Sequence, residues 1–154
     1  YIKEVVRALK NGLLFPLRPR TPHLAVDMLI EMPCKGIVLI KKDTGWAIPG
    51  GFCNYGESVE AAAIREAKEE THLDIELICQ LKTYSDPKRD PRVHTVSVAF
   101  IAKATGTPMA DDDAKEVGIF TEGNLPEKIC YDHHEIISDY FSWRNGLAFT
   151  KNVL

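Results

Sequence analysis

The 154-residue sequence has few cysteines, little net charge and no long apolar run, and each shortage excludes a class of protein. Cys34, Cys53, Cys79 and Cys130 form neither a CxxC pair nor a zinc-site spacing, so we expect buried, reduced thiols in a cytoplasmic protein. The formal net charge of −3 lacks the basic surplus of a general nucleic-acid binder. No apolar run is long enough to span a membrane. We therefore expect no nucleic-acid partner and no membrane partner. With 45% hydrophobic and 27% charged residues, the chain has the composition of a globular protein.

Residues 1–20 differ in character from the rest of the chain. Apolar residues at helical spacing over 2–9 predict a short amphipathic helix that ends near Gly12. Prolines then interrupt the stretch 15–22, which predicts an extended connector. The helix either covers the core or pairs with a second copy of the chain, so a homodimer is one hypothesis. We expect residues 21–154 to form the main domain.

The main domain shows strand patterns separated by two helical patterns. One helix is expected to begin at Ser58, a favourable N-cap residue, and to end at Thr71. A second is expected from Asp132 to about Asn145, with Asp132 and Glu135 in a capping-box-like arrangement. This order predicts an α/β layered sandwich with a mixed sheet. The expected strands are 23–32, 36–40, 46–48, 75–84, 94–104 and 117–120, of which 36–40 is apolar enough to be covered on both faces.

Three glutamates of the first helix share one face. Glu66, Glu69 and Glu70 stand at positions i, i+3 and i+4, a spacing at which like charges repel one another. On an isolated helix this pattern would be read as a solvated acidic face. Oxygen ligands in such a cluster also suit a hard cation such as Mg²⁺ or Mn²⁺, whose remaining positions are usually completed by water and substrate phosphates. The cluster therefore points to a phosphate-bearing substrate.

The stretch from Gly51 to Leu73 resembles the Nudix box, G-x5-E-x7-R-E-U-x-E-E-x-G-U, where U is apolar. Every position matches except one, because His72 stands where the family has its second glycine. That glycine ends the helix, often in the left-handed conformation, which His tolerates at a cost of about 1 kcal/mol. We expect a loss of stability and no loss of catalysis. Taken with the order of the elements, the resemblance covers about residues 21–145.

The resemblance implies the α/β/α sandwich of Nudix hydrolases, with a mixed central sheet, and hydrolysis of a nucleoside diphosphate linked to another moiety. It also implies a divalent cofactor, Mg²⁺ or Mn²⁺. Arg65 and Glu57 would orient or support the ligands. The general base is either a box glutamate or a carboxylate of a later loop, where Glu116 ranks ahead of Asp112 and Asp113. The implied metal ligands are Gly50 (through its carbonyl), Glu66, Glu69 and Glu70, and the implied catalytic residues are Glu66, Glu69, Arg65 and Glu116.

The segment after the box resembles the corresponding loop of ADP-ribose pyrophosphatases, which typically carry a proline where Pro87 stands. Its cations could contact a terminal phosphate or ribose, although a charged hairpin tip is the alternative. Tyr84 and Phe120 could stack on adenine, or could belong to the core. The substrate-binding candidates are Arg89, Arg92, Lys88 and Tyr84.

The leading hypothesis is hydrolysis of a small-molecule nucleotide, ADP-ribose, to AMP and ribose 5-phosphate. One alternative is an enzyme that removes damaged nucleoside triphosphates, such as oxidised dGTP. Another is a nucleotide-sensing Nudix module that does not cleave its ligand. The intact charged positions of the box favour an enzyme.

Overall fold

The structure is a computed structural model, and it describes residues 3, 6, 21–110 and 115–146. Within the predicted N-terminal helix only Lys3 and Val6 are described, and both are helical. The rest of that helix, the connector at 15–20, Asp112 and Asp113 lie outside the described residues.

The predicted strands and helices are present, with small differences at their ends. Two elements were not predicted, β4 and the 3₁₀ helix η1, because neither is long enough to show a periodic pattern. The elements are β1 (His23–Met32), β2 (Gly36–Lys42), β3 (Gly45–Ala47), β4 (Gly50–Phe52), α2 (Val59–Thr71), β5 (Ile75–Tyr84), β6 (Thr95–Ala104), β7 (Glu116–Phe120), η1 (Glu122–Asn124) and α3 (His133–Arg144).

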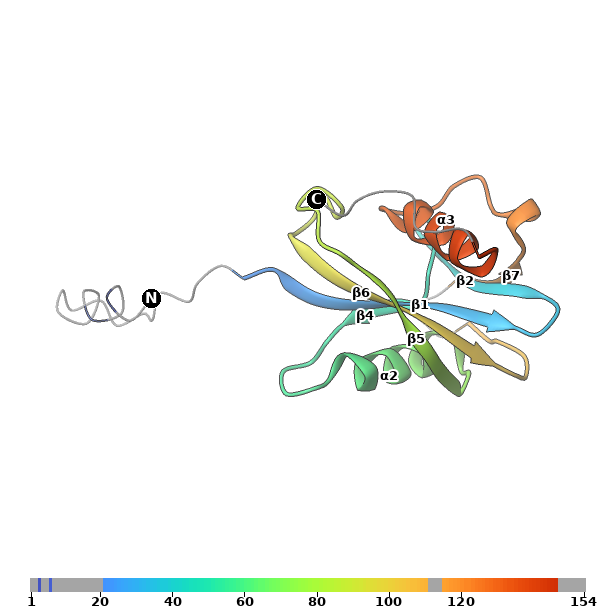
Figure 1. The fold of residues 1–154 in the computed structure, drawn as a ribbon, viewed down its shortest axis with the longest axis horizontal. Helices are drawn as coiled ribbons and strands as arrows, with labels where there is room; N and C mark the ends of the chain where they lie inside the picture. Colours follow the sequence, from blue (N-terminus) through green and yellow to red (C-terminus); the bar gives the residue numbers. More distant parts are fainter. Residues whose placement is uncertain (1–2, 4–5, 7–20, 111–114, 147–154) are drawn as a thin grey trace.

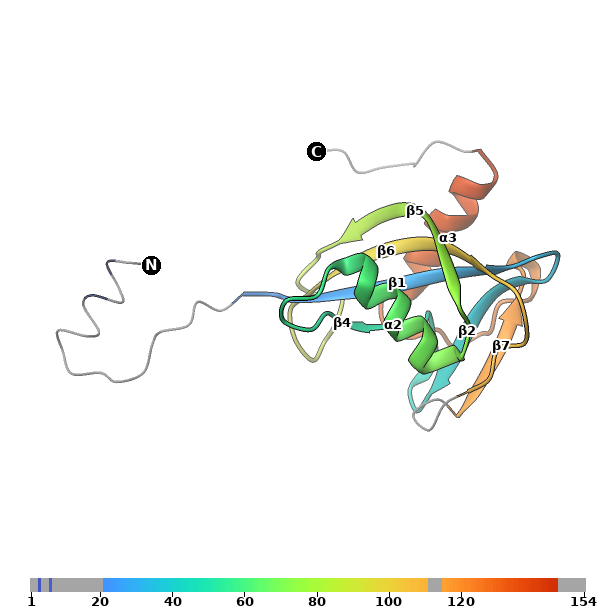
Figure 2. The ribbon, with the colours of Figure 1, turned by 90° about the horizontal axis from the view of Figure 1, so that it is seen from below.

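The strands form one 7-stranded sheet in the order β3-β2-β1-β6-β5, with β4 on β1 and β7 on β2. β1 and β6 run parallel, whereas the other pairs are antiparallel, so the predicted mixed sheet is confirmed. Figure 1 shows α2 on one face of the sheet and α3 on the other. Figure 2, seen from the α2 side, shows that helix lying across the sheet. The fold is the predicted α/β/α sandwich.

Each face of the sheet has its own hydrophobic core. On the α3 side, Leu29 and Leu39 pack with Tyr140 of the helix. On the α2 side, Met28 and Val38 pack with alanines of the helix such as Ala63. Small side chains let α2 lie close to the sheet, which brings its polar flank near β4. The apolar strand β2 contributes to both cores, as its sequence predicted.

The helix ends test three local predictions. Ser58 Oγ accepts a hydrogen bond from Ala61 N at 3.1 Å and caps α2, as expected. His72 ends α2 in the left-handed conformation at φ 58°, as the glycine that it replaces would. The capping-box prediction for α3 is wrong, because the Asp132 side chain makes no cap hydrogen bond. Its carboxylate is bonded to Arg89 instead.

The cysteines are free, and their burial was predicted only in part. Cys130 is buried and Cys53 and Cys79 are half-buried, but Cys34 is exposed. Cys34 lies in the β1–β2 turn (φ 58°), outside both hydrophobic cores. Among the described helices, none has the length and apolar character needed to cross a membrane.

Candidate active site

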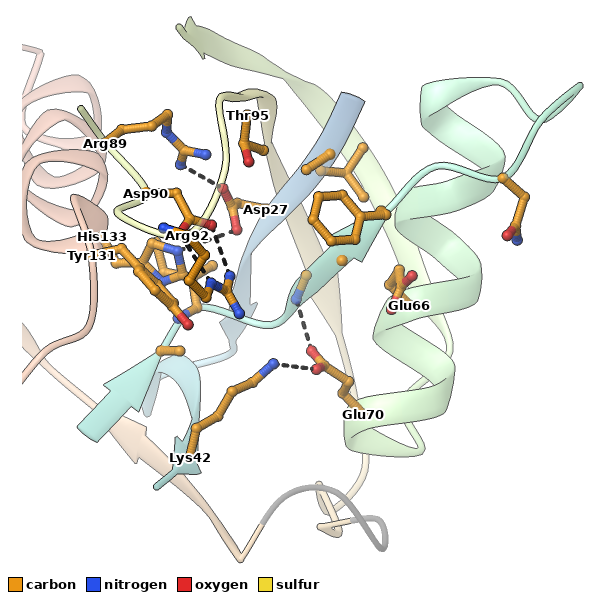
Figure 3. A pocket seen from close by; sticks show the side chains of 18 residues that line it. Asp27, Lys42, Glu66, Glu70, Arg89, Asp90, Arg92, Thr95, Tyr131 and His133 are labelled. Carbon is orange, nitrogen blue, oxygen red and sulfur yellow. Dashed lines mark hydrogen bonds and ion pairs between the residues drawn. The ribbon is translucent and has the colours of Figure 1, made fainter. Parts of the chain in front are cut away.

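A pocket of about 460 Å³ opens where β1, β2, β4 and α2 meet the β5–β6 loop and the start of α3. Figure 3 shows α2 forming one wall, with the loop and α3 opposite. Charged and titratable side chains from five parts of the fold converge here, which makes the pocket the candidate active site. They are Asp27, Lys42, Glu66, Glu70, Arg89, Asp90, Arg92 and His133.

Close approach between α2 and β4 depends on the glycine that opens the box. A Cβ atom at Gly51 would lie only 2.4 Å from the carboxyl carbon of Glu66. Any other residue would push that carboxylate away, so the box glycine creates the space that Glu66 occupies. The Glu66 side chain is 14% exposed and faces the pocket (Figure 3).

Glu70 is held between a backbone amide and a lysine. Its Oε2 accepts from Gly50 N at 2.8 Å, and its Oε1 accepts from Lys42 Nζ at 2.8 Å. Burial raises the pKa of Glu70, and the charge and hydrogen bonds of Lys42 and Gly50 oppose that rise. The carboxylate is thus costly to bury alone and is stabilised by the adjacent cation.

Arg65 organises the other carboxylates of the box. Its guanidinium donates to both oxygens of Glu57 at 2.8 and 2.9 Å, to Glu66 at 2.7 Å and to Glu69 at 3.1 Å. A further bond to the Phe52 carbonyl, at 3.0 Å, ties α2 to the end of β4. The Arg65 hydrogen bonds, with one from Asn54 N, lower the pKa of Glu57 to about 2. Glu57 is therefore ionised at any physiological pH.

The opposite wall is built on Asp27, a buried carboxylate of β1. Asp27 accepts from Ser97 Oγ at 2.5 Å and from Arg89 Nη2 at 3.3 Å, and His133 Nε2 lies 3.5 Å away. Arg89 also donates to both oxygens of Asp132 at 2.7 and 2.8 Å. The Arg89 side chain is only 6% exposed. Its charge is thus neutralised within the protein, and it ties the β5–β6 loop to β1 and α3.

Arg92 and two aromatic rings form the exposed rim. The Arg92 guanidinium stacks over the Tyr131 ring at 4.7 Å and donates to both oxygens of Asp90 at 3.0 and 2.8 Å. The Arg92 side chain is 61% exposed, in contrast with Arg89. Phe52 and Tyr131 line the pocket and are partly exposed, so each offers a flat apolar face.

The structure brings together five of the predicted site residues. Gly50, Glu66, Glu70, Arg89 and Arg92 line one pocket.

The remaining predicted site residues do not line the pocket. Arg65 contacts the box carboxylates without lining the pocket, and Glu69 is 58% exposed beside it. Glu116 pairs with Lys41 at 3.3 Å, and Lys88 is exposed; neither lines the pocket. Tyr84 is buried, and its hydroxyl donates a hydrogen bond to Asp139 Oδ2 at 2.8 Å.

Sequence reasoning missed Asp27, Lys42, Tyr131 and His133 at this pocket. One signal was available, because Asp27 interrupts the otherwise apolar centre of the expected strand 23–32. A buried acid in such a strand requires a partner. Tyr131 and His133 flank Asp132, whose capping-box-like pattern predicted only the start of a helix. Within the described residues, no three His, Cys, Asp or Glu side chains already stand in metal-binding proximity.

A mixed sheet lies between two helices, and the acidic helix α2, whose carboxylates are held by Arg65, packs beside the Gly50–Gly51 pair of β4. The NUDIX domain model matches residues 21–140, so the chain belongs to the Nudix family of enzymes.

Individual relatives agree with that assignment. A curated ADP-ribose pyrophosphatase from Methanocaldococcus jannaschii is 47% identical over 154 aligned positions, covering 95% of this chain and 88% of the relative. The crystal structure of a MutT/nudix family protein from Enterococcus faecalis is 28% identical, with a TM-score of 0.70 over 95% of this chain and 70% of that one. The NUDIX hydrolase from Nitrosomonas europaea, 24% identical, matches the fold with a TM-score of 0.76 over 89% of this chain and 81% of that one.

Proposed function

We propose that this enzyme hydrolyses the pyrophosphate bond of ADP-ribose and releases AMP and ribose 5-phosphate. The observation that carries the proposal is the 47% identity to an ADP-ribose pyrophosphatase over 95% of the chain. The pocket supports it, because an acidic wall for a metal–diphosphate group faces a rim with a guanidinium and aromatic rings.

The donor set fits a divalent metal ion, which we propose to be Mg²⁺ or Mn²⁺. Glu66 and Glu70 present carboxylate oxygens, the hard ligands that these ions prefer. Glu70 already sits beside a cation, Lys42, so positive charge is accommodated at this position. The ion would be held by Glu66, Glu69, Glu70 and the Gly50 carbonyl. When bound, it would neutralise phosphate oxygens and lower the pKa of a water molecule.

The chain's own residues would position the groups and move the proton. Arg65 keeps Glu66 and Glu69 oriented through its hydrogen bonds. A carboxylate takes a proton from the attacking water, the new P–O bond forms, and the other phosphate leaves with the electrons of the broken bond. We rank Glu66 first as the base, because it lines the pocket, whereas Glu69 and Glu116 do not.

We propose that the rim selects the substrate. Arg92 has solvent-facing donors for a phosphate or ribose, and Tyr131 beneath it offers a stacking face for adenine. Lys88 would add positive charge from the same loop. Arg89, whose donors are already bonded to Asp27 and Asp132, would act by holding the loop.

A substrate panel tests the function. Pyrophosphate cleavage is measured on ADP-ribose, other nucleoside diphosphate sugars, dinucleoside polyphosphates, and normal and oxidised dNTPs, with Mg²⁺ or Mn²⁺ and with Glu70→Gln as the blank. We expect a metal-dependent signal dominated by ADP-ribose. Dominance of oxidised dGTP would reassign the enzyme to nucleotide-pool cleaning. Tight nucleotide binding without any cleavage would indicate a sensing module.

We also propose a homodimer to which residues 1–20 contribute, from the apolar spacing of their predicted helix. Sedimentation of the full chain and of a chain lacking residues 1–20 tests this. An unchanged number of chains per particle would reject the contribution of that segment.

A further inference from the structure

The segment Ile48–Gly50, which leads from β3 into the first residue of β4, is held by three different elements. Ile48 N donates to His133 Nδ1 of α3 at 2.9 Å. Met28 N of β1 donates to the Pro49 carbonyl at 2.8 Å. Gly50 N donates to Glu70 Oε2 of α2 at 2.8 Å. The position of Gly50 against the box carboxylates therefore depends on contacts outside the box.

The His133 ring is suited to this contact in one protonation state only. Because Nδ1 accepts a hydrogen bond, it carries no proton, and the proton of the neutral ring lies on Nε2. Nε2 lies 3.5 Å from Asp27 Oδ1, and that carboxylate is itself held by Ser97 and Arg89. The His133 side chain is 8% exposed, so water does not replace these partners.

Asp27 constrains the same segment from the strand side. Asp27 and Gly50 are register partners in the β1–β4 pair. A Cβ atom at Gly50 would lie 2.8 Å from Asp27 Oδ1 and 2.2 Å from the Val26 carbonyl, so the backbone there lies directly against β1. His133 and Asp27 thus enclose the turn that leads into the box, and a shift of Ile48 would be transmitted through one proline to Gly50.

We propose that His133 is a positioning residue for the reaction: by accepting the Ile48 N–H from the first turn of α3, it sets the place of Gly50 against Glu70 and Glu66. This role rests on the proposed function, in which Gly50, Glu66 and Glu70 hold the metal ion. It assigns α3, which contributes nothing to the box, a part in shaping the metal site.

The expected effect is that of removing a group that orients metal ligands, about 10- to 100-fold in metal affinity or activity. His133→Ala should weaken Mn²⁺ binding and lower kcat, with KM for ADP-ribose close to that of the wild type. His133→Asn should restore much of both, because Asn Oδ1 can accept at the place of Nδ1. His133→Gln, whose acceptor reaches the place of Nε2, should not.

The experiment is a titration of Mn²⁺ by electron paramagnetic resonance on the protein without substrate, together with kcat and KM for each variant. Tyr140→Phe is the matched control, because it removes a bond from the same helix, Tyr140 to Glu31 at 2.7 Å, away from the pocket. The Asn and Gln variants are a size-graded pair that keeps a polar side chain at the site, should the alanine variant fail to fold.

Recovery by Asn and not by Gln, with a normal Tyr140→Phe, supports the role. If the wild type binds Mn²⁺ and cleaves ADP-ribose but Asn and Gln behave alike, or His133→Ala matches Tyr140→Phe, the positioning role is overturned while the proposed function stands. A wild type that binds no Mn²⁺ overturns both.

Discussion

The two walls of the pocket carry similar numbers of charges but treat them differently. On the α2 wall, Glu70 pairs with Lys42, whose side chain is 36% exposed. On the opposite wall, Arg89 lies 6% exposed between Asp27 and Asp132. The half-buried Lys42 can be replaced beside Glu70 by another cation, whereas the buried Arg89 guanidinium cannot leave its two carboxylate partners. The α2 wall, the exchangeable wall, can therefore exchange the Lys42 ammonium for a bound metal ion. The opposite wall, the fixed wall, keeps its charges paired within the protein.

The largest expected effect of a single substitution comes from the exchangeable wall. Glu70→Gln should lower kcat by several powers of ten, because it removes a proposed metal ligand, and should leave the fold intact. Burial already disfavours the charged form of Glu70, so a neutral amide of the same size costs little stability. Steady-state kinetics and thermal unfolding measure both quantities.

Glu60→Gln is the matched control on the same helix, since Glu60 is exposed and does not line the pocket. Turnover of Glu70→Gln near that of Glu60→Gln at saturating Mg²⁺ would refute the metal-site assignment.

A substitution in the fixed wall should instead lower the free energy of unfolding. Arg89→Ala leaves Asp27 and Asp132 buried without their cation, and removal of one partner from a buried ion pair costs about 3–5 kcal/mol. Denaturant unfolding measures the loss. A change in the free energy of unfolding below about 1 kcal/mol, the scale of exposed pairs, would show that the two walls do not differ as described.

Arg92→Ala sharpens the comparison, because Arg92 belongs to the same loop as Arg89 but is 61% exposed. The free energy of unfolding of the Arg92→Ala variant should differ from that of the wild type by less than about 1 kcal/mol. Loss of a charged hydrogen bond to substrate should raise KM for ADP-ribose about tenfold, with kcat nearly unchanged. An unchanged KM would remove Arg92 from the proposed substrate contacts.

The smallest expected effect is a pH dependence of stability from His133. Burial lowers the pKa of this imidazole below its ordinary value of 6.5; Asp27 and Asp132 oppose the shift, while Arg89 and Lys42 add to it. Below pH 6.5 the unfolded chain binds a proton that the folded chain does not. Stability should therefore be full above pH 6.5 and fall as the pH drops toward the folded pKa, by at most about 1.4 kcal/mol per pH unit.

The check is denaturant unfolding of the wild type and His133→Asn at pH 7.5 and at pH 5.5, since the variant lacks this titration but shares all others. Parallel losses of stability in the two proteins would contradict a depressed pKa at His133.

Local patterns predicted the parts of this protein whose causes are local. The strands, both helices, the N-cap at Ser58 and the left-handed end at His72 each follow from a few adjacent residues. The spacing of the box likewise placed Glu66 and Glu70 on one flank of α2.

What could not be predicted depends on contacts between distant segments. Arg89 and Arg92 are the same residue type in the same charged loop, so the sequence does not distinguish them. The Arg89 side chain is buried because it pairs with Asp27 of β1 and Asp132 at the start of α3, whereas the Arg92 side chain is exposed. The alternatives left open for the aromatic candidates were decided by the same kind of contact: Tyr84 and Phe120 pack in the core on the α3 side, whereas Tyr131 lines the pocket. Asp132 could not be recognised as an Arg89 partner, because its sequence context resembles a helix cap.

The parallel pairing of β1 with β6 has a consequence for how the protein is made. Asp27 and Ser97 are 70 positions apart, and His133 lies still further along the chain from the Ile48 amide, at 85 positions. Such long-range contacts are slow to form, since a large loop must close before they stabilise the chain. During synthesis the box helix leaves the ribosome well before the residues that complete its pocket. The nascent enzyme should thus display its acidic helix early and acquire activity only once α3 has emerged.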